Sequence, residues 1–205
     1  MIGVLDYGMG NLRSVCNAVY EIGQDWVLRD NGEEFDDLSH LIIPGVGHFA
    51  TAMRQLRERE LEAPIRAFAA SGRPVLGVCL GMQILAGHGA EGGGQAGLGL
   101  IPATVEPLPK IPGQRIPHMG WNTVSFRQEH PLTRGAKDGR DYYFVHSYAM
   151  VCDEMRNVIG ITDYGADFVS FAANDNVAGF QFHPEKSQIN GLQLLENFCN
   201  WDGRC

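Results

Sequence analysis

The sequence predicts a single α/β domain, in which a mostly parallel central sheet is flanked by helices and extended by antiparallel strands in the second half. Short apolar runs alternate with amphipathic segments of helical period through the first half. Such alternation is typical of a parallel sheet covered on both faces. From about residue 104, strand-like runs separated by turn residues follow one another without helices between them, which indicates antiparallel pairing. A length of 205 residues suits one domain with a sizeable core.

Apolar runs and helical periodicity place the elements of the first half. Asn11 can cap a helix, because its side chain can accept a hydrogen bond from a backbone N–H of the first turn. The apolar face of this helix comprises Leu12, Val15, Cys16, Val19 and Ile22. The predicted strands are residues 2–6, 26–28, 41–43 and 74–78. Three helices are predicted: one from 11 to near 23, one over 49–59, and one that runs towards residue 71.

The second half is predicted to consist of strands and one final helix. Residues 87–99 are rich in glycine and are expected to form a flexible loop. Ser187 can cap the last helix. The side chains of that helix expected to point inward are Ile189, Leu192, Leu195 and Phe198. The predicted strands are residues 122–126, 142–148, 158–162, 168–172 and 177–182.

Charge and cysteine content exclude several functional classes. The formal net charge is −8 and no Lys/Arg cluster counters it, so we expect no nucleic-acid partner and no membrane partner. The cysteines are scattered and odd in number, which argues against a disulfide framework and a zinc site and favours a cytoplasmic location. They are Cys16, Cys79, Cys152, Cys199 and Cys205. No segment has transmembrane length, and the first strand shows no features of a secretory leader.

The segment 74–83 carries the strongest chemical signal. Cys79 lies between an apolar run that ends at Val78 and a helical pattern, and Gly77 and Gly81 flank it. This Gly-x-Cys-x-Gly frame is typical of a nucleophile elbow, a sharp strand-to-helix turn that crowds neighbouring side chains. A helix N-terminus favours a thiolate through its free N–H groups. Cys79 is therefore a candidate nucleophile, and the alternative is a buried structural cysteine.

A nucleophilic cysteine needs a base, and His183 is the candidate. It ends a predicted strand and is followed by Pro184 and Glu185. Residues two apart on an extended chain point to the same side, so Glu185 can orient the imidazole towards Cys79. The alternative is a surface His-Pro-Glu turn. His146 is a competing base, but it has no nearby carboxylate in the sequence and is expected to sit in the sheet.

The loop after the third strand allows a different class of function. Residues 45–50 fit the pattern Gly-x-Gly-x-x-Ala of a dinucleotide site. Such a site needs an acidic residue at the end of a second strand about 20 residues on. Residues 61–68 have a helical pattern instead, so the dinucleotide interpretation fails. The loop can direct backbone N–H groups at an oxyanion, or it can be a simple tight turn.

Segments 77–83 and 181–185 together resemble the class-I glutamine amidotransferases, which use a Cys-His-Glu triad. Five further segments narrow the resemblance to the glutaminase subunits of imidazole glycerol phosphate synthase. They are residues 6–15, 44–47, 117–122, 142–148 and 183–187. The resemblance covers essentially the whole chain, although residues 92–94 and 201–205 carry no motif of that family.

This resemblance implies a site that needs neither metal nor cofactor. Cys79 would attack the side-chain amide of L-glutamine, with His183 as general acid and base and Glu185 orienting it. The implied site residues are Val46, Gly47 and Leu80, whose segments would hold the oxyanion through backbone N–H groups, and Gln83, Glu91, Ser147 and Tyr148, which would bind glutamine.

The resemblance also implies a partner. Ammonia is largely protonated in bulk water and is then not nucleophilic, so it should pass directly to the enzyme that uses it. In this family that enzyme is a (β/α)8-barrel cyclase, which forms a heterodimer with the glutaminase and makes imidazole glycerol phosphate from a phosphoribulosyl-formimino carboxamide ribonucleotide in histidine biosynthesis. The residues at the family's interface positions are Asn11, Met119, Trp121, Tyr143 and Lys186. For Trp121 and Tyr143 the alternative is core packing, and for Lys186 it is a solvated charge.

The glycines of the 44–47 loop suggest regulation. Gly45 and Gly47 would allow its peptides to flip towards the site or away from it, so the free subunit is expected to be nearly inactive until the partner's ligand biases the flip.

Two other functions remain possible from the sequence. One is a related glutaminase that supplies ammonia to a different acceptor enzyme. The other is a non-catalytic protein in which the elbow cysteine senses oxidants or binds a small molecule. The second has no need for Glu185 or for the 44–47 loop.

Overall fold

Five parallel strands form the centre of a mixed sheet in the computed structural model, which describes residues 1–204; Cys205 lies outside the described residues. In spatial order they are β2 (Trp26–Arg29), β1 (Ile2–Leu5), β3 (His40–Gly45), β4 (Val75–Cys79) and β13 (Val177–Phe180). The carboxyl ends of parallel strands are the usual ligand-binding edge of such sheets. Cys79 is the last residue of the buried strand β4, so the candidate nucleophile lies on this edge.

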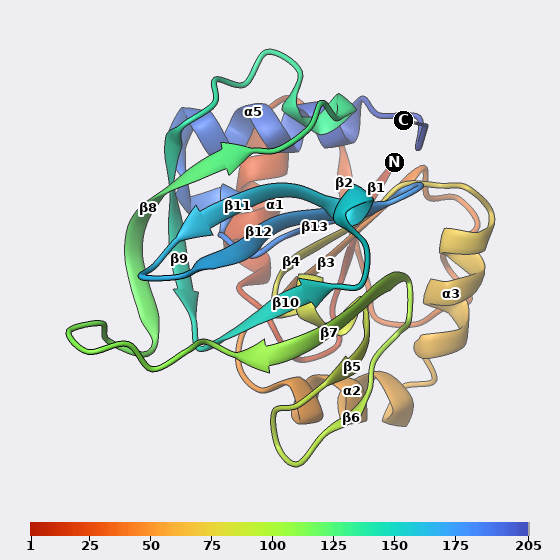
Figure 1. Ribbon diagram of the computed structural model, residues 1–205. Helices are drawn as coiled ribbons and strands as arrows, with labels where there is room; N and C mark the ends of the chain where they lie inside the picture. Colours follow the sequence, from red (N-terminus) through yellow and green to blue (C-terminus); the bar gives the residue numbers. More distant parts are fainter. Residues whose placement is uncertain (205) are drawn as a thin grey trace.

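Helices cover both faces of the parallel strands (Figure 1). Helices α1 (Leu12–Glu21) and α5 (Gln188–Cys199) pack on one face, and α2 (Phe49–Glu58) and α3 (Glu62–Ala70) pack on the other. Alternate strand residues point to opposite faces. Val4 and Ile42 therefore belong to the core under α1 and α5, whereas Leu41 and Ile43 belong to the core under α2 and α3. The predicted α/β fold with a parallel centre is confirmed.

The second half of the chain extends this sheet with mainly antiparallel strands. Beyond β13 the order continues through β12 (Asp167–Asn174), β10 (Tyr148–Cys152), β7 (Ile101–Pro107), β5 (Ala86–Gly89) and β6 (Gln95–Ala96). A branch runs from β12 through β11 (Val158–Asp163) and β8 (His118–Phe126) to β9 (Arg140–His146). The turns include the short helix α4 (Leu80–Ile84) and the 3₁₀ helices η1 (Pro131–Thr133), η2 (Met155–Asn157) and η3 (Pro184–Lys186).

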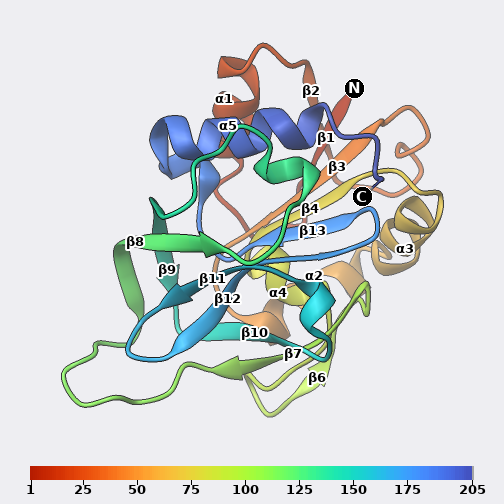
Figure 2. The same ribbon diagram turned by 45° about the horizontal axis from the view of Figure 1, so that its top comes forward.

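The branch strands β8 and β9 stand at one side of the molecule, and the long connection from β7 to β8 projects beyond them (Figure 2). Strand β13 joins the two parts of the sheet, because it is parallel to β4 and antiparallel to β12. The expectation of antiparallel pairing therefore holds for only one side of β13.

Part of the segment predicted as a flexible loop is a β-hairpin. Strands β5 and β6 pair antiparallel, with His88 opposite Ala96. Three successive glycines, at positions 92 to 94, have positive φ angles and make the turn between these strands. Backbone hydrogen bonds form whatever the side chains are, so a glycine-rich sequence hides such a hairpin from analysis of apolar patterns.

Strand boundaries in the second half differ from the prediction in several places. Strands β7 and β10 were not predicted, and β8 begins at His118 rather than at residue 122. The run 142–148 is divided at Ser147 between β9 and β10. An apolar run continues through a change of chain direction when the residues on both sides are buried, so composition alone did not locate this break.

The ends of two helices test the capping predictions. Asn11 accepts a hydrogen bond from the N–H of Ser14 at 3.4 Å, so its predicted capping role is confirmed. Ser187 stands at the N-cap of α5, but its hydroxyl donates to the carbonyl of His183 at 2.6 Å and makes no cap. Ile189 is 74% exposed, so the prediction that it points inward is wrong.

No helix in residues 1–204 has the length and apolarity needed to cross a membrane.

Candidate active site

Cys79 occupies a sharp turn between β4 and α4. Its backbone angles are φ 55° and ψ −110°, a conformation that residues with side chains rarely adopt. Its side chain is buried, with 5% exposed. Strained backbone of this kind persists only where the surrounding structure enforces it, and it is found preferentially at functional sites. The elbow predicted from the sequence is therefore present.

The flanking glycines allow α4 to pack directly on the strands beneath it. A Cβ atom at Gly81 would overlap the carbonyl oxygen of Ile43 in β3. A Cβ atom at Gly77 would lie 2.5 Å from the carbonyl oxygen of Gly81. Both obstacles are backbone atoms, which cannot move aside as a flexible side chain can. The elbow thus requires glycine at both positions for reasons of space.

His183 and Glu185 form a buried pair beside the elbow. Nδ1 of His183 lies 2.8 Å from Oε1 of Glu185, and their side chains are 2% and 1% exposed. The route to this contact differs from the prediction, because β13 ends at Phe180 and η3 begins at Pro184. A 3₁₀ turn, and not an extended strand, brings the carboxylate onto the imidazole.

The imidazole of His183 is held in its charged form. Burial lowers its pKa, but hydrogen bonding and attraction to Cys79 and Glu185 outweigh burial and raise the pKa to about 10. Because Nδ1 is engaged by Glu185, Nε2 is the remaining nitrogen. It is buried and hydrogen-bonds to no nitrogen or oxygen atom within residues 1–204. It is therefore the atom available to exchange a proton with the Cys79 sulfur.

A hollow of about 260 Å³ opens beside Cys79. The structure gathers the predicted oxyanion and glutamine-binding residues around it: Val46, Gly47, Leu80, Gln83, Glu91, Ser147 and Tyr148. Pro117, Val145 and His146 complete the lining, and of these the sequence suggested a role only for His146, as the competing base. All three lie in segments that carry the family resemblance, residues 117–122 and 142–148, which is the signal that could have indicated them.

The two longest polar side chains of the hollow have defined partners. Oε2 of Glu91 accepts a hydrogen bond from the N–H of Phe49 at 2.7 Å, at the start of α2. The amide nitrogen of Gln83 donates to the carbonyl of Tyr148 at 2.9 Å and to Oε1 of Gln181 at 3.0 Å. Both amide hydrogens of Gln83 are thus used, and only its Oε1 remains for a bound molecule.

The two glycines of the loop next to the elbow are favoured for different reasons. A Cβ atom at Gly45 would lie 2.7 Å from both the backbone nitrogen of Gly81 and the hydroxyl of Tyr7. Gly45 is therefore required for close packing, and its part in a peptide flip stays a prediction. Gly47 has φ +111°, in the region that favours glycine, and the neighbouring Val46 is 40% exposed. At Gly47, the backbone conformation and not close packing is the reason for glycine.

His146, the competing base, is buried in the sheet as expected. Its Nδ1 lies 2.8 Å from the carbonyl oxygen of Tyr148, and its Nε2 lies 2.9 Å from Nδ1 of His118. Burial is the main cause that lowers the pKa of His146, to about 3. Both ring nitrogens are occupied, and no carboxylate within residues 1–204 is among the groups that shift its pKa, so His183 is the better base.

Four of the five residues at predicted interface positions form one surface, which we call the aromatic surface: Met119, Trp121, Tyr143 and Lys186. Met119 is 62% exposed and Trp121 is 49% exposed, so core packing does not explain Trp121. The rings of Trp121 and Tyr143 meet edge to face with centroids 6.1 Å apart. Nζ of Lys186 lies 5.7 Å from the centroid of Tyr143. Asn11 is exposed at the start of α1, which packs against η3.

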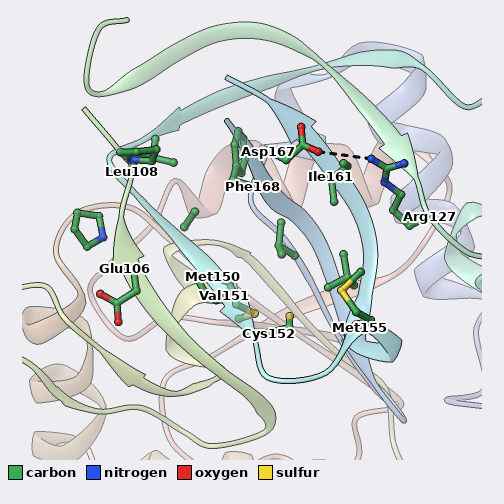
Figure 3. A pocket seen from close by; sticks show the side chains of 15 residues that line it. Glu106, Leu108, Arg127, Met150, Val151, Cys152, Met155, Ile161, Asp167 and Phe168 are labelled. Carbon is green, nitrogen blue, oxygen red and sulfur yellow. Dashed lines mark ion pairs between the residues drawn. The ribbon is translucent and has the colours of Figure 1, made fainter. Parts of the chain in front are cut away.

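A second, larger hollow lies away from the elbow. It measures about 660 Å³ and is lined by mostly apolar side chains of β7, β10, β11 and β12, including Met150 and Phe168 (Figure 3). Arg127 and Asp167 form an ion pair of 3.7 Å at its rim. None of the predicted site residues lines it. Within residues 1–204 no group of three or more His, Cys, Asp or Glu side chains is arranged to hold a metal ion.

Comparison with known proteins identifies the family. A model described as glutamine amidotransferase class-I matches residues 3–200. The chain belongs to the class-I glutamine amidotransferases. This amidotransferase is 47% identical over 204 residues to imidazole glycerol phosphate synthase subunit HisH of Sulfurimonas denitrificans, which covers 98% of each chain. It is 46% identical over 201 residues to the subunit of the same name from Desulfitobacterium hafniense, covering 98% of this chain and 94% of that one.

A solved structure has the same fold. The structure of PurLQS from Thermotoga maritima superimposes with a TM-score of 0.74, covers 97% of both chains and is 19% identical in sequence. At that identity the likeness shows the fold alone. The family model and the HisH relatives together make this chain an enzyme of the glutaminase type, in the group of HisH subunits.

Proposed function

We propose that this amidotransferase hydrolyses L-glutamine at Cys79 and passes the ammonia to a cyclase subunit that makes imidazole glycerol phosphate in histidine biosynthesis. The observation that carries the proposal is the buried pair of His183 and Glu185, 2.8 Å apart, beside a cysteine in strained elbow geometry. A purely structural cysteine requires neither feature. A biosynthetic role of this kind belongs in the cytoplasm.

The first half-reaction forms a thioester. The Cys79 sulfur attacks the side-chain amide carbon of glutamine as a thiolate, while the charged His183 keeps its proton on Nε2. The carbonyl oxygen becomes an oxyanion, which accepts hydrogen bonds from the N–H of Leu80 and from the loop at Gly47. His183 then gives its Nε2 proton to the departing nitrogen, and the C–N bond breaks to release neutral ammonia.

The second half-reaction restores the enzyme. His183 takes a proton from water, and the hydroxide attacks the thioester carbon. The C–S bond breaks, glutamate leaves, and the Cys79 sulfur returns as a thiolate beside the charged His183. Glu185 accepts the Nδ1–H throughout, which keeps the ring orientation fixed and stabilises the imidazolium.

The charges of the hollow suggest how glutamine lies in it. The carboxylate of Glu91 is suited to the α-ammonium group of the substrate. Gln83 has only its Oε1 free, so it would accept a hydrogen bond from glutamine and would not donate one. Ser147 and Tyr148 would contact the remaining polar groups from the opposite wall.

The aromatic surface is the proposed docking site of the cyclase. Aromatic residues and methionine are enriched in protein interfaces, and this surface combines both with a lysine. It lies on β8, β9 and η3, next to His183 and the elbow. Ammonia released at Cys79 would therefore have a short path to the partner. Docking can also bias the loop at Gly47 towards the conformation that binds the oxyanion, which would prevent hydrolysis of glutamine without use of the ammonia.

The test is to purify the chain with a candidate cyclase and measure glutamate release and imidazole glycerol phosphate. Cys79→Ala should abolish glutamate release, whereas the complex should still make product from added ammonium salt. Loss of ammonium-dependent synthesis in a folded complex would contradict the division of labour. Glutaminase activity with no stable complex and no stimulation by the ribonucleotide would favour a different acceptor enzyme.

A further inference from the structure

The carbonyl oxygen of Tyr148 determines how a buried group of polar side chains is oriented. A carbonyl oxygen can only accept, so the Nδ1 of His146 at 2.8 Å and the amide nitrogen of Gln83 at 2.9 Å must both donate to it. The amide nitrogen of Gln83 also lies 3.0 Å from an amide oxygen of Gln181. Gln181 is fully buried, with 0% exposed. Its amide oxygen must face Gln83, and its NH2 group must point the other way.

The NH2 group of Gln181 points at the candidate nucleophile. Its nitrogen lies 3.8 Å from the Cys79 sulfur, a hydrogen-bond distance for a sulfur acceptor. The other hydrogen bond of that sulfur, 3.7 Å to the carbonyl of Val145, uses the thiol proton and is lost on ionisation. The hydrogen bond donated by Gln181 is kept when the thiol ionises, and it becomes stronger, because a charged acceptor makes a stronger hydrogen bond than a neutral one.

We propose that Gln181 is a catalytic residue of this amidotransferase, whose amide N–H holds the Cys79 thiolate ready for attack, with Gln83 and Tyr148 fixing the direction of that amide. The inference rests on the proposed function, because it takes Cys79 as the nucleophile. It extends that function to Gln181, a residue that was given no role in the predicted site. Gln181 lies behind the sulfur, not in the lining of the hollow, so it acts on the nucleophile and not on glutamine.

Other charged or titratable groups also act on this sulfur and must stay unchanged in the test. His183 and Tyr7 interact electrostatically with Cys79. Glu185 pairs with His183, and Glu91 and His146 line the hollow next to Cys79. Substitution of Gln181 leaves all of these groups in place, so a changed thiol reports on the amide.

The experiment measures the rate of Cys79 alkylation by iodoacetamide between pH 5 and pH 10 in the full-length chain, because the thiolate is the reactive form. Peptide mass spectrometry assigns the label to Cys79. The other cysteines within residues 1–204 react slowly near neutral pH, since burial raises the pKa of Cys16 to about 11 and the pKa of Cys152 and Cys199 to about 12. The variant Gln181→Met keeps the length of the side chain and removes the donor.

We expect Gln181→Met to raise the pH midpoint of Cys79 alkylation by about one to two pH units and to slow alkylation at pH 7 by about tenfold or more. The acid limb of kcat/KM for glutaminase activity should move up by the same amount, with KM for glutamine little changed. Gln181→Glu provides the second variant, because its carboxylate can still accept from Gln83 but cannot donate to the sulfur. It should raise the midpoint at least as far as Gln181→Met.

Gln193→Met on α5 is the matched control, since its amide bonds Asn197 and lies away from the elbow. It should leave the midpoint where it is. An unchanged midpoint in either folded Gln181 variant would overturn the inference, even if turnover fell. A wild-type complex with no glutaminase activity would instead defeat the proposed function, so the two failures are distinguishable.

Discussion

Replacement of Glu185 by Gln tests the chemistry of the buried pair most directly. The two side chains are 2.8 Å apart and 2% and 1% exposed, so water does not screen their interaction. A hydrogen bond to a charged group contributes about 1.5–3 kcal/mol, which corresponds to roughly 10- to 150-fold in rate. A neutral amide can also donate to Nδ1 and stabilise the wrong tautomer, an effect that reaches about 10⁴-fold in a comparable triad. We expect a loss of kcat between about 10² and 10⁴, smaller than the loss for His183→Ala.

The assay for Glu185→Gln is glutamate release by the complex, with circular dichroism as the control for folding. The pH dependence of stability supplies a second readout. The pKa of His183 is raised from 6.5 to about 10 in the folded protein, so its stabilising contribution is complete below pH 6.5 and is lost as the pH rises through 10. The variant should therefore be less stable than the wild type at pH 6, with the difference shrinking by pH 10. Wild-type turnover in Glu185→Gln, or a stability difference that grows with pH, would refute the reasoning.

Three further substitutions test the elbow, the loop and the buried histidines. Gly81→Ala should lower the free energy of unfolding by about 1–3 kcal/mol or more in urea denaturation, because its Cβ would overlap a backbone carbonyl. Gly87→Ala should lower the free energy of unfolding far less, because its Cβ would be 3.6 Å from its nearest contact. Gly47→Ala should lower ligand-stimulated turnover of the complex with little change in KM, since φ +111° disfavours a side chain. Stimulation of the variant equal to that of the wild type would contradict a role for this loop. His118→Phe removes the partner that lies 2.9 Å from Nε2 of His146, and it should raise KM for glutamine about tenfold. His118→Asn keeps a donor near that position and should raise KM less. Equal effects of the two substitutions would count against the hydrogen bond.

Local sequence determined the elements that carry the chemistry. The glycines beside Cys79 are required by contacts within the strand–turn–helix unit and with the adjacent strand, and a turn of that kind has a recognisable spacing. Glu185 is two residues from His183, so their contact was foreseeable even though the turn that makes it was not. The alternation in β1 and β3 likewise encodes which side chains face each layer of helices. In each case the interacting groups are near neighbours in the chain, or belong to elements whose period reveals their buried face.

Tertiary structure alone decided which distant polar groups meet. Gln181 hydrogen-bonds to Cys79, which is 102 residues away in the sequence, and to Gln83, which is 98 residues away. His118 and His146 are paired because β8 and β9 are neighbours in register. A buried amide or imidazole can bond to many partners, and its choice depends on which strands become adjacent, which no local pattern specifies. The apolar pattern of this sequence fixed the layers, whereas the register between strands decided the orientation of Gln181 and hence its contact with the nucleophile.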